Sequence, residues 1–410
     1  MCFGLNLYKC WKGYVFNFIF DRKNDARPYP NLAPMMNNPH QSYHGLGDDW
    51  PFISPCRLIH YCHDHGYPCN ISYLDQPIPE NAWYPVGLAF FHFDIDYFAM
   101  MADRVKDHLR AGDFRVLFYY HEGDNPWHEK KRLDSLCQHH DLPVSCYKFV
   151  SGNTVADQVP GFTWFPDHEL FYWRNAVRWN DRSMPGACYH DRPRTHRYTA
   201  LNRFHKWWRA TVMSELLQRG LLDNSYWSYI NIDSNDQWKD NPIQVESLNM
   251  VDQVKNFVQQ GTMSCDTLDP VQQNSHWTLV AEHFDDAYLH LILETLYDAE
   301  QSGGAFLTEK TFKPIRHAQP FVIFGTVHSL KTLRRLGYKT FDHLLDNEYD
   351  SITDNTVRFQ KTLQTLEKLN QQDLHDFYVS CRTQIIHNQE LFLSSKHSRL
   401  ERLYEKLNHD

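Results

Sequence analysis

An acidic residue and a lysine stand side by side in Thr308, Glu309 and Lys310, directly before a pattern that predicts a short helix. A carboxylate can accept hydrogen bonds from both hydroxyls of a ribose, and an ammonium group neutralises phosphate as a compact charge. A helix N-terminus adds backbone N–H donors and a favourable dipole for an anion. A short apolar strand at residues 320–325 then ends in glycine. Together these features predict a site for the ribose and diphosphate of a nucleotide sugar.

A second polar segment follows the strand predicted over residues 198–202. It begins at Asn202 and carries Arg203, Lys206 and Arg209 through a loop into the first turn of a predicted helix. Cations near a helix N-terminus oppose the macrodipole, so three of them cost stability unless an anion joins them. We therefore expect this loop to contact a diphosphate, although a solvated helix end is the alternative.

A third polar segment follows the apolar strand predicted over residues 116–120. In open parallel sheets the ligand crevice lies beyond the carboxyl ends of the strands, which is where Glu122 and Asp124 are expected. Asp124 or Asn125 is expected to cap the following helix. Glutamate is a poor N-cap, so a catalytic role and a structural role for Glu122 are both open.

Ordinary helix chemistry also explains part of this pattern. Thr308 is a plausible N-cap, and Glu309 with Lys313 has the spacing of a helical ion pair. The independent basic loop at residues 203–209 favours a binding site over this reading. Two interpretations stay open for Glu169 and Glu294. Each is either a partner of the site residues or a plain helix cap.

Two patterns resemble metal sites, and we expect neither to bind a metal. Asp94 and Asp96 form a pair of carboxylates that suits a divalent ion on a diphosphate, but Asp is also a preferred helix cap. Residues 57–67 have the pattern of an amphipathic helix closed by glycine, and their spacing matches no standard zinc motif. The possible ligands of this second group are His60, Cys62, His63, His65 and Cys69.

The composition bounds the function. The 410 residues carry a net charge of −9 with 42% hydrophobic and 15% aromatic side chains, which indicates a folded chain without a broad nucleic-acid footprint. Residues 1–20 lack the layout of a signal peptide, and no apolar run approaches the ~18 residues that span a bilayer. We expect a cytoplasmic protein with no membrane partner, ten reduced cysteines, and a solvated linker at residues 192–197.

Apolar runs alternate with helical patterns along most of the chain, which predicts an α/β fold with mainly parallel sheets. The sequence suggests a Rossmann-like lobe over residues 1–190 and a second over residues 198–350. Residues 351–410 have the pattern of amphipathic helices that pack across both lobes.

These segments resemble alpha-1,3-fucosyltransferase-like enzymes, which have the two-lobed GT-B fold and bind a nucleotide sugar in the second lobe. The Thr308 segment is similar to their donor motif, residues 119–126 to their Tyr-x-Gly-Glu-Asn segment, and residues 202–209 to their Asn-to-Arg loop. Residues 165–170 are similar to the aspartate-glutamate-leucine stretch downstream. Residues 112–349 also look like glycosyltransferase-like proteins of marine bacterial viruses, which would act in the host cytoplasm. The family's glycine before the glutamate is His121 here.

The resemblance implies a metal-independent glycosyltransferase without a cofactor, in which the nucleoside diphosphate sugar is the donor substrate. Glu309 would bind ribose, Lys310 and Arg209 the diphosphate, and Glu122 would be the general base at a hydroxyl acceptor. A glycan, a protein or a modified nucleic acid would be the acceptor. The alternative is a non-catalytic carbohydrate-binding or virion-associated protein, which does not need Arg209 and Lys310 to point at one place.

Overall fold

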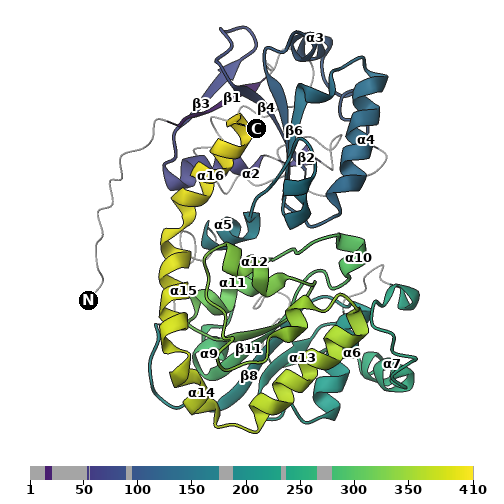
Figure 1. Cartoon of the computed structure of the whole chain (residues 1–410), viewed down its shortest axis with the longest axis vertical. Coiled ribbons are helices and arrows are strands. Elements are labelled where there is room, and N and C mark those ends of the chain that lie inside the picture. Colours follow the sequence, from purple (N-terminus) through teal and green to yellow (C-terminus); the bar gives the residue numbers. More distant parts are fainter. Residues whose placement is uncertain are drawn as a thin grey trace.

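The computed structural model describes residues 14–20, 53–54, 56–88, 95–174, 188–231, 237–265 and 279–409. These residues form two α/β lobes, each built on its own sheet, as Figure 1 shows. The α/β fold with two lobes that the sequence predicts is confirmed. None of the helices in these ranges is both long and apolar enough to cross a membrane.

The first lobe holds a sheet with strand order β3-β1-β4-β5-β6-β7, in which all neighbours on this path are parallel. Strand β2 pairs antiparallel with β4. Strands β4 and β5 are almost wholly buried, which explains their continuous apolar sequences. The elements are β1 (Phe16–Phe20), β2 (Ile53–Ser54), α2 (Arg57–His65), β3 (Cys69–Tyr73), β4 (Ala82–Leu88), α3 (Asp103–Ala111), β5 (Arg115–Tyr120), α4 (Pro126–His139), β6 (Tyr147–Ser151), β7 (Phe162–Trp164) and α5 (Asp167–Trp173).

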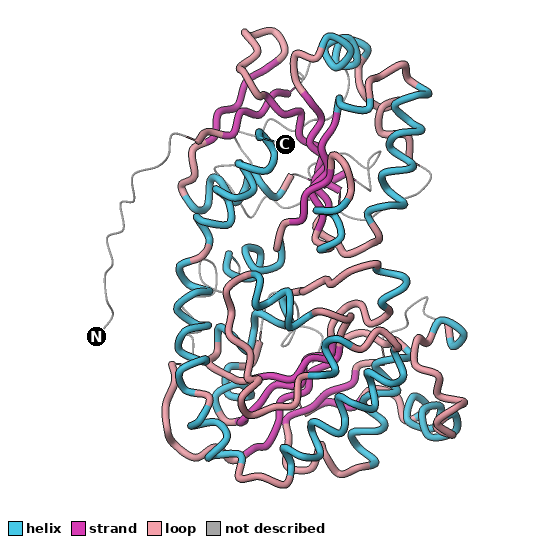
Figure 2. Tube along the Cα trace, in the orientation of Figure 1, coloured by secondary structure: helices cyan, strands magenta, loops and turns pink. Residues whose placement is uncertain are grey.

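The second lobe holds a sheet with strand order β10-β9-β8-β11-β12, parallel except for the β9–β10 pair. Figure 2 shows the two sheets, each with helices around it. The elements are β8 (His196–Asn202), α6 (Trp207–Gln218), β9 (Tyr226–Tyr229), α7 (Val251–Gln259), β10 (Met263–Ser264), α9 (Ala281–Asp285), β11 (Ala287–Leu293), α10 (Ala299–Ser302), α11 (Glu309–Arg316), β12 (Phe321–Phe324) and α12 (Ser329–Arg335).

Four helices follow the second sheet and return the chain to the first lobe (Figure 1). Leu400, Leu403 and Leu407 of the last helix are buried in one apolar cluster with Phe16 and Leu58 of the first lobe. Burying a leucine side chain contributes about 1.5–3 kcal/mol, so this stripe fastens the chain end to the first sheet. The helices are α13 (Asn355–Asn370), α14 (Leu374–Ser380), α15 (Arg382–Ser394) and α16 (Lys396–His409).

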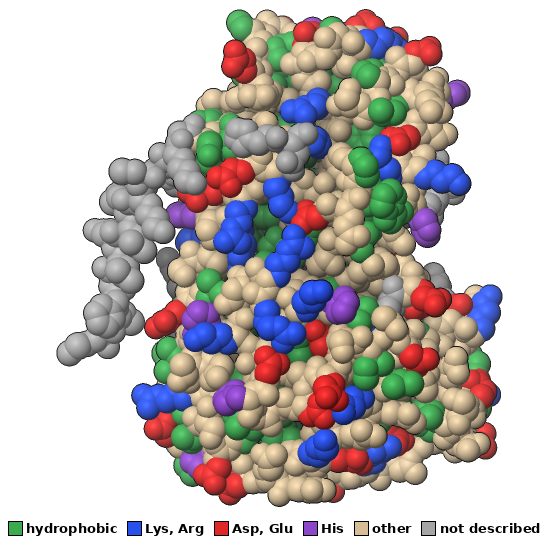
Figure 3. Space-filling model, in the orientation of Figure 1, with side chains coloured by type: hydrophobic (Ala, Val, Ile, Leu, Met, Phe, Trp, Pro, Cys, Tyr) green, Lys and Arg blue, Asp and Glu red, His purple; other side chains and the backbone are tan. Residues whose placement is uncertain are grey.

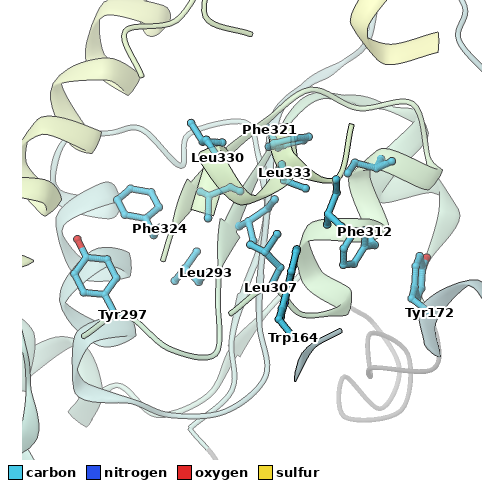
Figure 4. Close-up of a cluster of buried hydrophobic side chains, with 14 of the residues drawn as sticks. Trp164, Tyr172, Leu293, Tyr297, Leu307, Phe312, Phe321, Phe324, Leu330 and Leu333 are labelled. Atoms are coloured by element: carbon cyan, nitrogen blue, oxygen red, sulfur yellow. The ribbon is translucent and has the colours of Figure 1, made fainter. Parts of the chain in front are cut away.

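A larger apolar cluster runs through both lobes without a break. Figure 4 shows Phe312 of α11 and Leu307 packed near Trp164 and Tyr172, which belong to the first lobe. Helix α11 therefore sits at the contact between the lobes, with its N-terminus at the end of β11.

The expectation of a solvated linker at residues 192–197 holds for Arg192, Pro193 and Thr195, which are exposed, but is wrong for Arg194. Arg194 is buried and donates hydrogen bonds to the carbonyl of Phe284 and to the hydroxyl of Tyr378. Its guanidinium also lies 4.2 Å from the centre of the Tyr378 ring. The basic run was misleading because arginine can satisfy several buried carbonyls and an aromatic face at once.

Candidate functional site

The end of β11 is held by one buried carboxylate, that of Glu294. Its Oε1 accepts from the backbone N–H of Thr308 at 3.0 Å and from the Thr311 hydroxyl, and its Oε2 accepts from the Thr308 hydroxyl at 2.6 Å and from the N–H of Thr295 at 3.0 Å. Thr308 is the N-cap of α11, since its Oγ1 accepts from the N–H of Lys310. Glu294 thus fixes the start of α11 against the strand end. We call residues 294–295 and 306–311 the β11 edge.

Three cations meet at this edge. Arg209 donates from Nε and Nη2 to the carbonyl of Glu294, at 3.2 and 2.6 Å. Lys206 donates to the carbonyl of Thr295 at 2.9 Å, and Lys310 donates to the hydroxyl of Thr295 at 3.0 Å. The arginine and the two lysines come from two segments about a hundred residues apart, and they lie around one dipeptide, as the sequence predicts. The N-cap residue of α6 is Lys206, whose side chain makes no capping hydrogen bond in the described part of the chain, and the first turn of α6 contains no acidic residue.

Glu309 is buried beside these cations. Lys310 Nζ lies 3.2 Å from its Oε1, and His168 of the first lobe lies 3.5 Å from its Oε2. Burial alone would raise the pKa of Glu309, but the positive charges of Lys310, His168 and Lys313 hold that pKa well below its usual value. Glu309 is therefore ionised and can accept hydrogen bonds from a diol.

Lys313 adds a buried ammonium to the same cluster. Burial is the main cause that lowers the pKa of Lys313 to about 8. The charge of Glu309 raises this pKa, and the charges of Lys310 and Arg203 lower it further. An incoming anion would relieve this repulsion. Asn202 is also buried, and within the described residues its Nδ2 has no hydrogen-bond partner. The edge thus has positive charge and an unused donor.

The end of β5 carries Glu122, whose side chain is 32% exposed and lies 3.2 Å from Nε2 of His121. Burial alone would raise its pKa, but His121, His168 and Arg57 outweigh burial and lower the pKa of Glu122 to about 2. The carboxylate is ionised throughout the physiological range. We call residues 121–125 the β5 edge.

Asp124 lies on the same edge and is exposed. Its neighbour Asn125 is the N-cap of α4, accepting from the N–H of Trp127 at 3.1 Å, so the expected cap at 124 or 125 is Asn125. Asp124 instead accepts from the hydroxyl of Tyr120. Partial desolvation and the charge of Glu122 raise the pKa of Asp124. The hydrogen bond from Tyr120 and the charge of Lys206, which belongs to the second lobe, lower it by less. The sequence placed Asp124 beyond the strand end but favoured a capping role for Asp124 or Asn125, and the Asn-Pro helix start directly after Asp124 is the signal that Asn125 is the cap.

Residues behind the β5 edge are tied into a buried network. Asp167 accepts from Arg57 at 2.7 Å, from Tyr119 at 2.6 Å and from Tyr61 at 2.9 Å, and Arg57 in turn lies 2.8 Å from Nε2 of His121. This chain of contacts orients His121 and, through it, Glu122.

Glu169, left open by the sequence, joins the lobes. It accepts hydrogen bonds from Tyr338 at 2.6 Å, from Ser395 at 2.7 Å and from Arg399 at 2.9 Å. The first partner belongs to the second lobe and the other two to the returning C-terminal chain, so Glu169 has a structural role.

The two edges are in direct contact. Phe306 lies against Gly123 and Gly152, where a Cβ on either glycine would overlap its ring. Asn153 donates to the carbonyl of Ser302 at 2.6 Å, and the N–H of Thr154 donates to the carbonyl of Ala305 at 3.0 Å. Glycine is needed here because the ring of Phe306 approaches the backbone closely. On the face in Figure 3, Lys and Arg side chains gather near the level at which the lobes meet.

The two sequence patterns that resemble metal sites form ordinary local structure where the structure describes them. Asp96 caps the turn at residues 97–100 by accepting from the N–H groups of Phe98 and Ala99, whereas Asp94 lies outside the described residues. Residues 57–65 form the expected helix α2. Among the side chains that the structure describes, no three ligand atoms come together in the segment from residue 57 to residue 69.

No protein-family model matches the sequence, and no curated protein matches it. Among solved structures, the chain is similar to the Anabaena protein HepE, solved in complex with UDP and glucose. The alignment covers 97% of this chain and 100% of that chain, with 9% identity and a TM-score of 0.38. A likeness at this level supports no inference about activity.

Proposed function

We propose that the protein is a glycosyltransferase that moves a sugar from a nucleoside diphosphate donor to a hydroxyl acceptor. The observation that carries this proposal is the meeting of Lys206, Arg209 and Lys310 around residues 294–295, beside the ionised carboxylate of Glu309. A carboxylate for a ribose diol next to fixed cations for a diphosphate matches the two parts of such a donor.

In the proposed reaction, the donor lies on the β11 edge. Glu309 accepts from the ribose hydroxyls, while Lys310, Lys206 and Arg203 neutralise charge that develops on the departing diphosphate. Arg209 is buried and binds the carbonyl of Glu294, so we assign it to positioning that carbonyl and to the positive field. The amide of Asn202 supplies a further donor. No metal or cofactor takes part in the step as we propose it.

The β5 edge would activate the acceptor. A general base works best with a pKa near the operating pH, and a carboxylate with a pKa of about 2 is a weak one. We therefore propose that Asp124, whose pKa is raised, takes the proton of the acceptor hydroxyl. Glu122, the base implied by the resemblance, would stay ionised and stabilise positive charge on the sugar ring. Two carboxylates with pKa values pushed apart suit these separate roles.

The substrate and cellular assignments follow from this proposal. The sugar is a hexose or fucose, the acceptor is a glycan, a protein or a modified nucleic acid, and the reaction takes place in the cytoplasm, that of the host if the protein is viral. The alternative is a carbohydrate-binding or virion-associated protein without catalysis. A protein that only binds carbohydrate does not need a cluster of cations beside a carboxylate that can bind a ribose.

The test is a thermal-shift and titration panel of uridine, guanosine, adenosine, cytidine and thymidine diphosphates with their sugars. A ligand that binds only the folded state raises the melting temperature by mass action. We expect one nucleotide to stabilise the wild type and its affinity to fall at least tenfold in Lys310→Ala.

The matched control is Lys331→Ala, because Lys331 is an exposed lysine in the same lobe, on α12. That variant should bind the nucleotide like the wild type. If no nucleotide at millimolar concentration shifts the wild type, or if both lysine variants lose the same affinity, the donor site is wrong and the carbohydrate-binding alternative is preferred.

A further inference from the structure

A second group of ligand-type side chains lies in the first lobe, away from the β5 edge. Asp96, His139 and His140 each place one possible metal-ligand atom within 4.8 Å of the other two. They come from the turn after β4 and from the end of α4, segments that are over forty residues apart. Two imidazoles and one carboxylate are ligands that zinc and neighbouring transition metals prefer, whereas magnesium and calcium prefer oxygen alone.

Two of the three side chains, those of Asp96 and His140, are held in a definite orientation. Asp96 Oδ1 accepts from the N–H groups of Phe98 at 3.1 Å and Ala99 at 2.9 Å, which leaves Oδ2 facing His140 Nε2 at 2.7 Å. The His140 ring packs near that of Phe98, with 6.2 Å between centroids. Hydrogen bonds to the unused oxygen of a ligating carboxylate are the usual support that fixes such a ligand.

The end of α4 brings the two histidines together. Neighbouring residues inside a helix point in different directions. His140, however, is the C-cap residue, with φ −101° and ψ 12°, and its ring centroid lies 4.9 Å from that of His139. Zinc with ligands at about 2.0–2.2 Å would hold those ligands roughly 3.3–3.5 Å apart. Because His139 is exposed, rotation of its side chain can bring its ring nitrogen to that distance from the other two ligand atoms.

The charges around the group are compatible with a cation. Arg110 donates to the carbonyl of His140 at 3.1 Å, but the same guanidinium is paired with Asp107 at 2.8 Å. A divalent ion would take the place of the proton shared between Asp96 and His140. Three protein ligands would leave at least one position for water.

We propose that Asp96, His139 and His140 form a binding site for a divalent transition-metal ion of the zinc class, which staples the turn at residues 95–101 to the end of α4. The inference is independent of the proposed glycosyltransferase activity. Helix α4 has 14 residues and starts at the β5 edge, so its length puts His139 about 20 Å from that edge. The metal would therefore stabilise the first lobe and would not touch the donor diphosphate.

The experiment uses the untagged full chain after treatment with a chelator. Zinc chloride is titrated by calorimetry into the wild type, Asp96→Asn and His139→Ala, and cobalt absorption reports the ligand set. We expect the wild type to bind one more equivalent than either variant, or to bind that equivalent at least tenfold more tightly. Zinc should raise the melting temperature of the wild type but not that of Asp96→Asn or His139→Ala.

The matched control is His108→Ala. His108 and Asp113 form a histidine–aspartate pair at 2.7 Å on the same lobe, and no third ligand joins them among the described residues, so this variant should bind zinc like the wild type. His139 is exposed, and circular dichroism verifies that its variant folds. If the wild type and His139→Ala bind zinc with equal stoichiometry and affinity, the metal is adventitious and the proposal is overturned. Chelation should leave the affinity for the nucleotide diphosphate unchanged.

Discussion

Glu294 and Glu122 hold similar places in the two lobes, each just beyond the carboxyl end of a buried parallel strand. Glu294 is fully buried and accepts four hydrogen bonds, whereas Glu122 is 32% exposed and has the ring of His121 as its close neighbour. The first carboxylate builds the β11 edge, and the second is available to a substrate. A glutamate at a strand end is thus structural or functional according to the donors that surround it.

The largest effect on stability should come from removing the buried carboxylate of Glu294. Glu294→Ala leaves the donors of Thr295, Thr308 and Thr311 without their acceptor in a buried place, so we expect a loss of about 3–5 kcal/mol in the free energy of unfolding. Chemical denaturation measures it. Glu300→Ala, which alters an exposed carboxylate, should cost less than about 1 kcal/mol, and Glu122→Ala, which alters a part-exposed one, should cost less than Glu294→Ala. Equal losses in Glu294→Ala and Glu122→Ala would remove the contrast between the two edges.

The next effect separates the two carboxylates of the β5 edge. We expect Asp124→Asn to lower the rate of sugar transfer, or of donor hydrolysis by water, by about a hundredfold or more, because general bases contribute that much. Glu122→Gln should cost about tenfold, as the loss of one nearby charge. Rates measured from pH 4 to 9 should fall on the acid side in the wild type as Asp124 protonates, and this limb should vanish in Asp124→Asn. The opposite ranking of the two variants would make Glu122 the base.

A smaller effect tests the contact between the edges. A Cβ at Gly123 would overlap Phe306, so Gly123→Ala should destabilise the closed arrangement of the lobes by about 1–3 kcal/mol. Small-angle scattering should show a larger radius of gyration. The control is the same change in a Phe306→Ala background, where the ring is gone and only the Cβ of residue 306 stays close, so the cost should be partly relieved. An additive double variant would show that the ring does not press on this glycine.

The smallest effect concerns Lys313. Its pKa of about 8 in the folded protein is below the usual 10.5, so the unfolded chain binds more protons between these values. This group therefore adds stability as the pH rises from about 8 to about 10.5. A bound diphosphate should raise the pKa of Lys313 again, so binding near pH 8 should take up a fraction of a proton. Calorimetry in buffers of different ionisation enthalpy measures that fraction, and it should disappear in Lys313→Met. Proton uptake that survives in the variant would assign it to another group.

Local sequence patterns were sufficient for most of the fold. The strand at residues 116–120, the helix after Asn125 and the N-cap at Thr308 all follow from apolar periodicity and capping chemistry. Such signals act over a few residues, which is the distance that backbone geometry controls. The meeting of Arg209 with Lys310 was also predictable, because parallel strands bring their carboxyl ends to one edge.

Contacts between distant segments could not be derived in this way. Glu294 reaches Thr308 and Thr311, which are 14 and 17 residues away, and Asn153 reaches Ser302 across 149 residues. The burial of Arg194 depends on the same kind of long-range packing. Sequence patterns indicate that a polar residue is present at a strand end, but its partners decide its ionisation and its role.

The segment that carries Phe306 also carries Thr308, and only one residue separates the ring that docks on the first lobe from the cap of the donor-side helix. The two events are therefore linked in free energy: whatever a bound nucleotide does to Thr308 and α11 also changes the docking of Phe306 on Gly123. Linkage of this kind is reciprocal. If the nucleotide strengthens acceptor binding by a given factor, the acceptor strengthens nucleotide binding by the same factor. A short stretch of chain thus couples the affinities of the two substrates, whichever of them binds first.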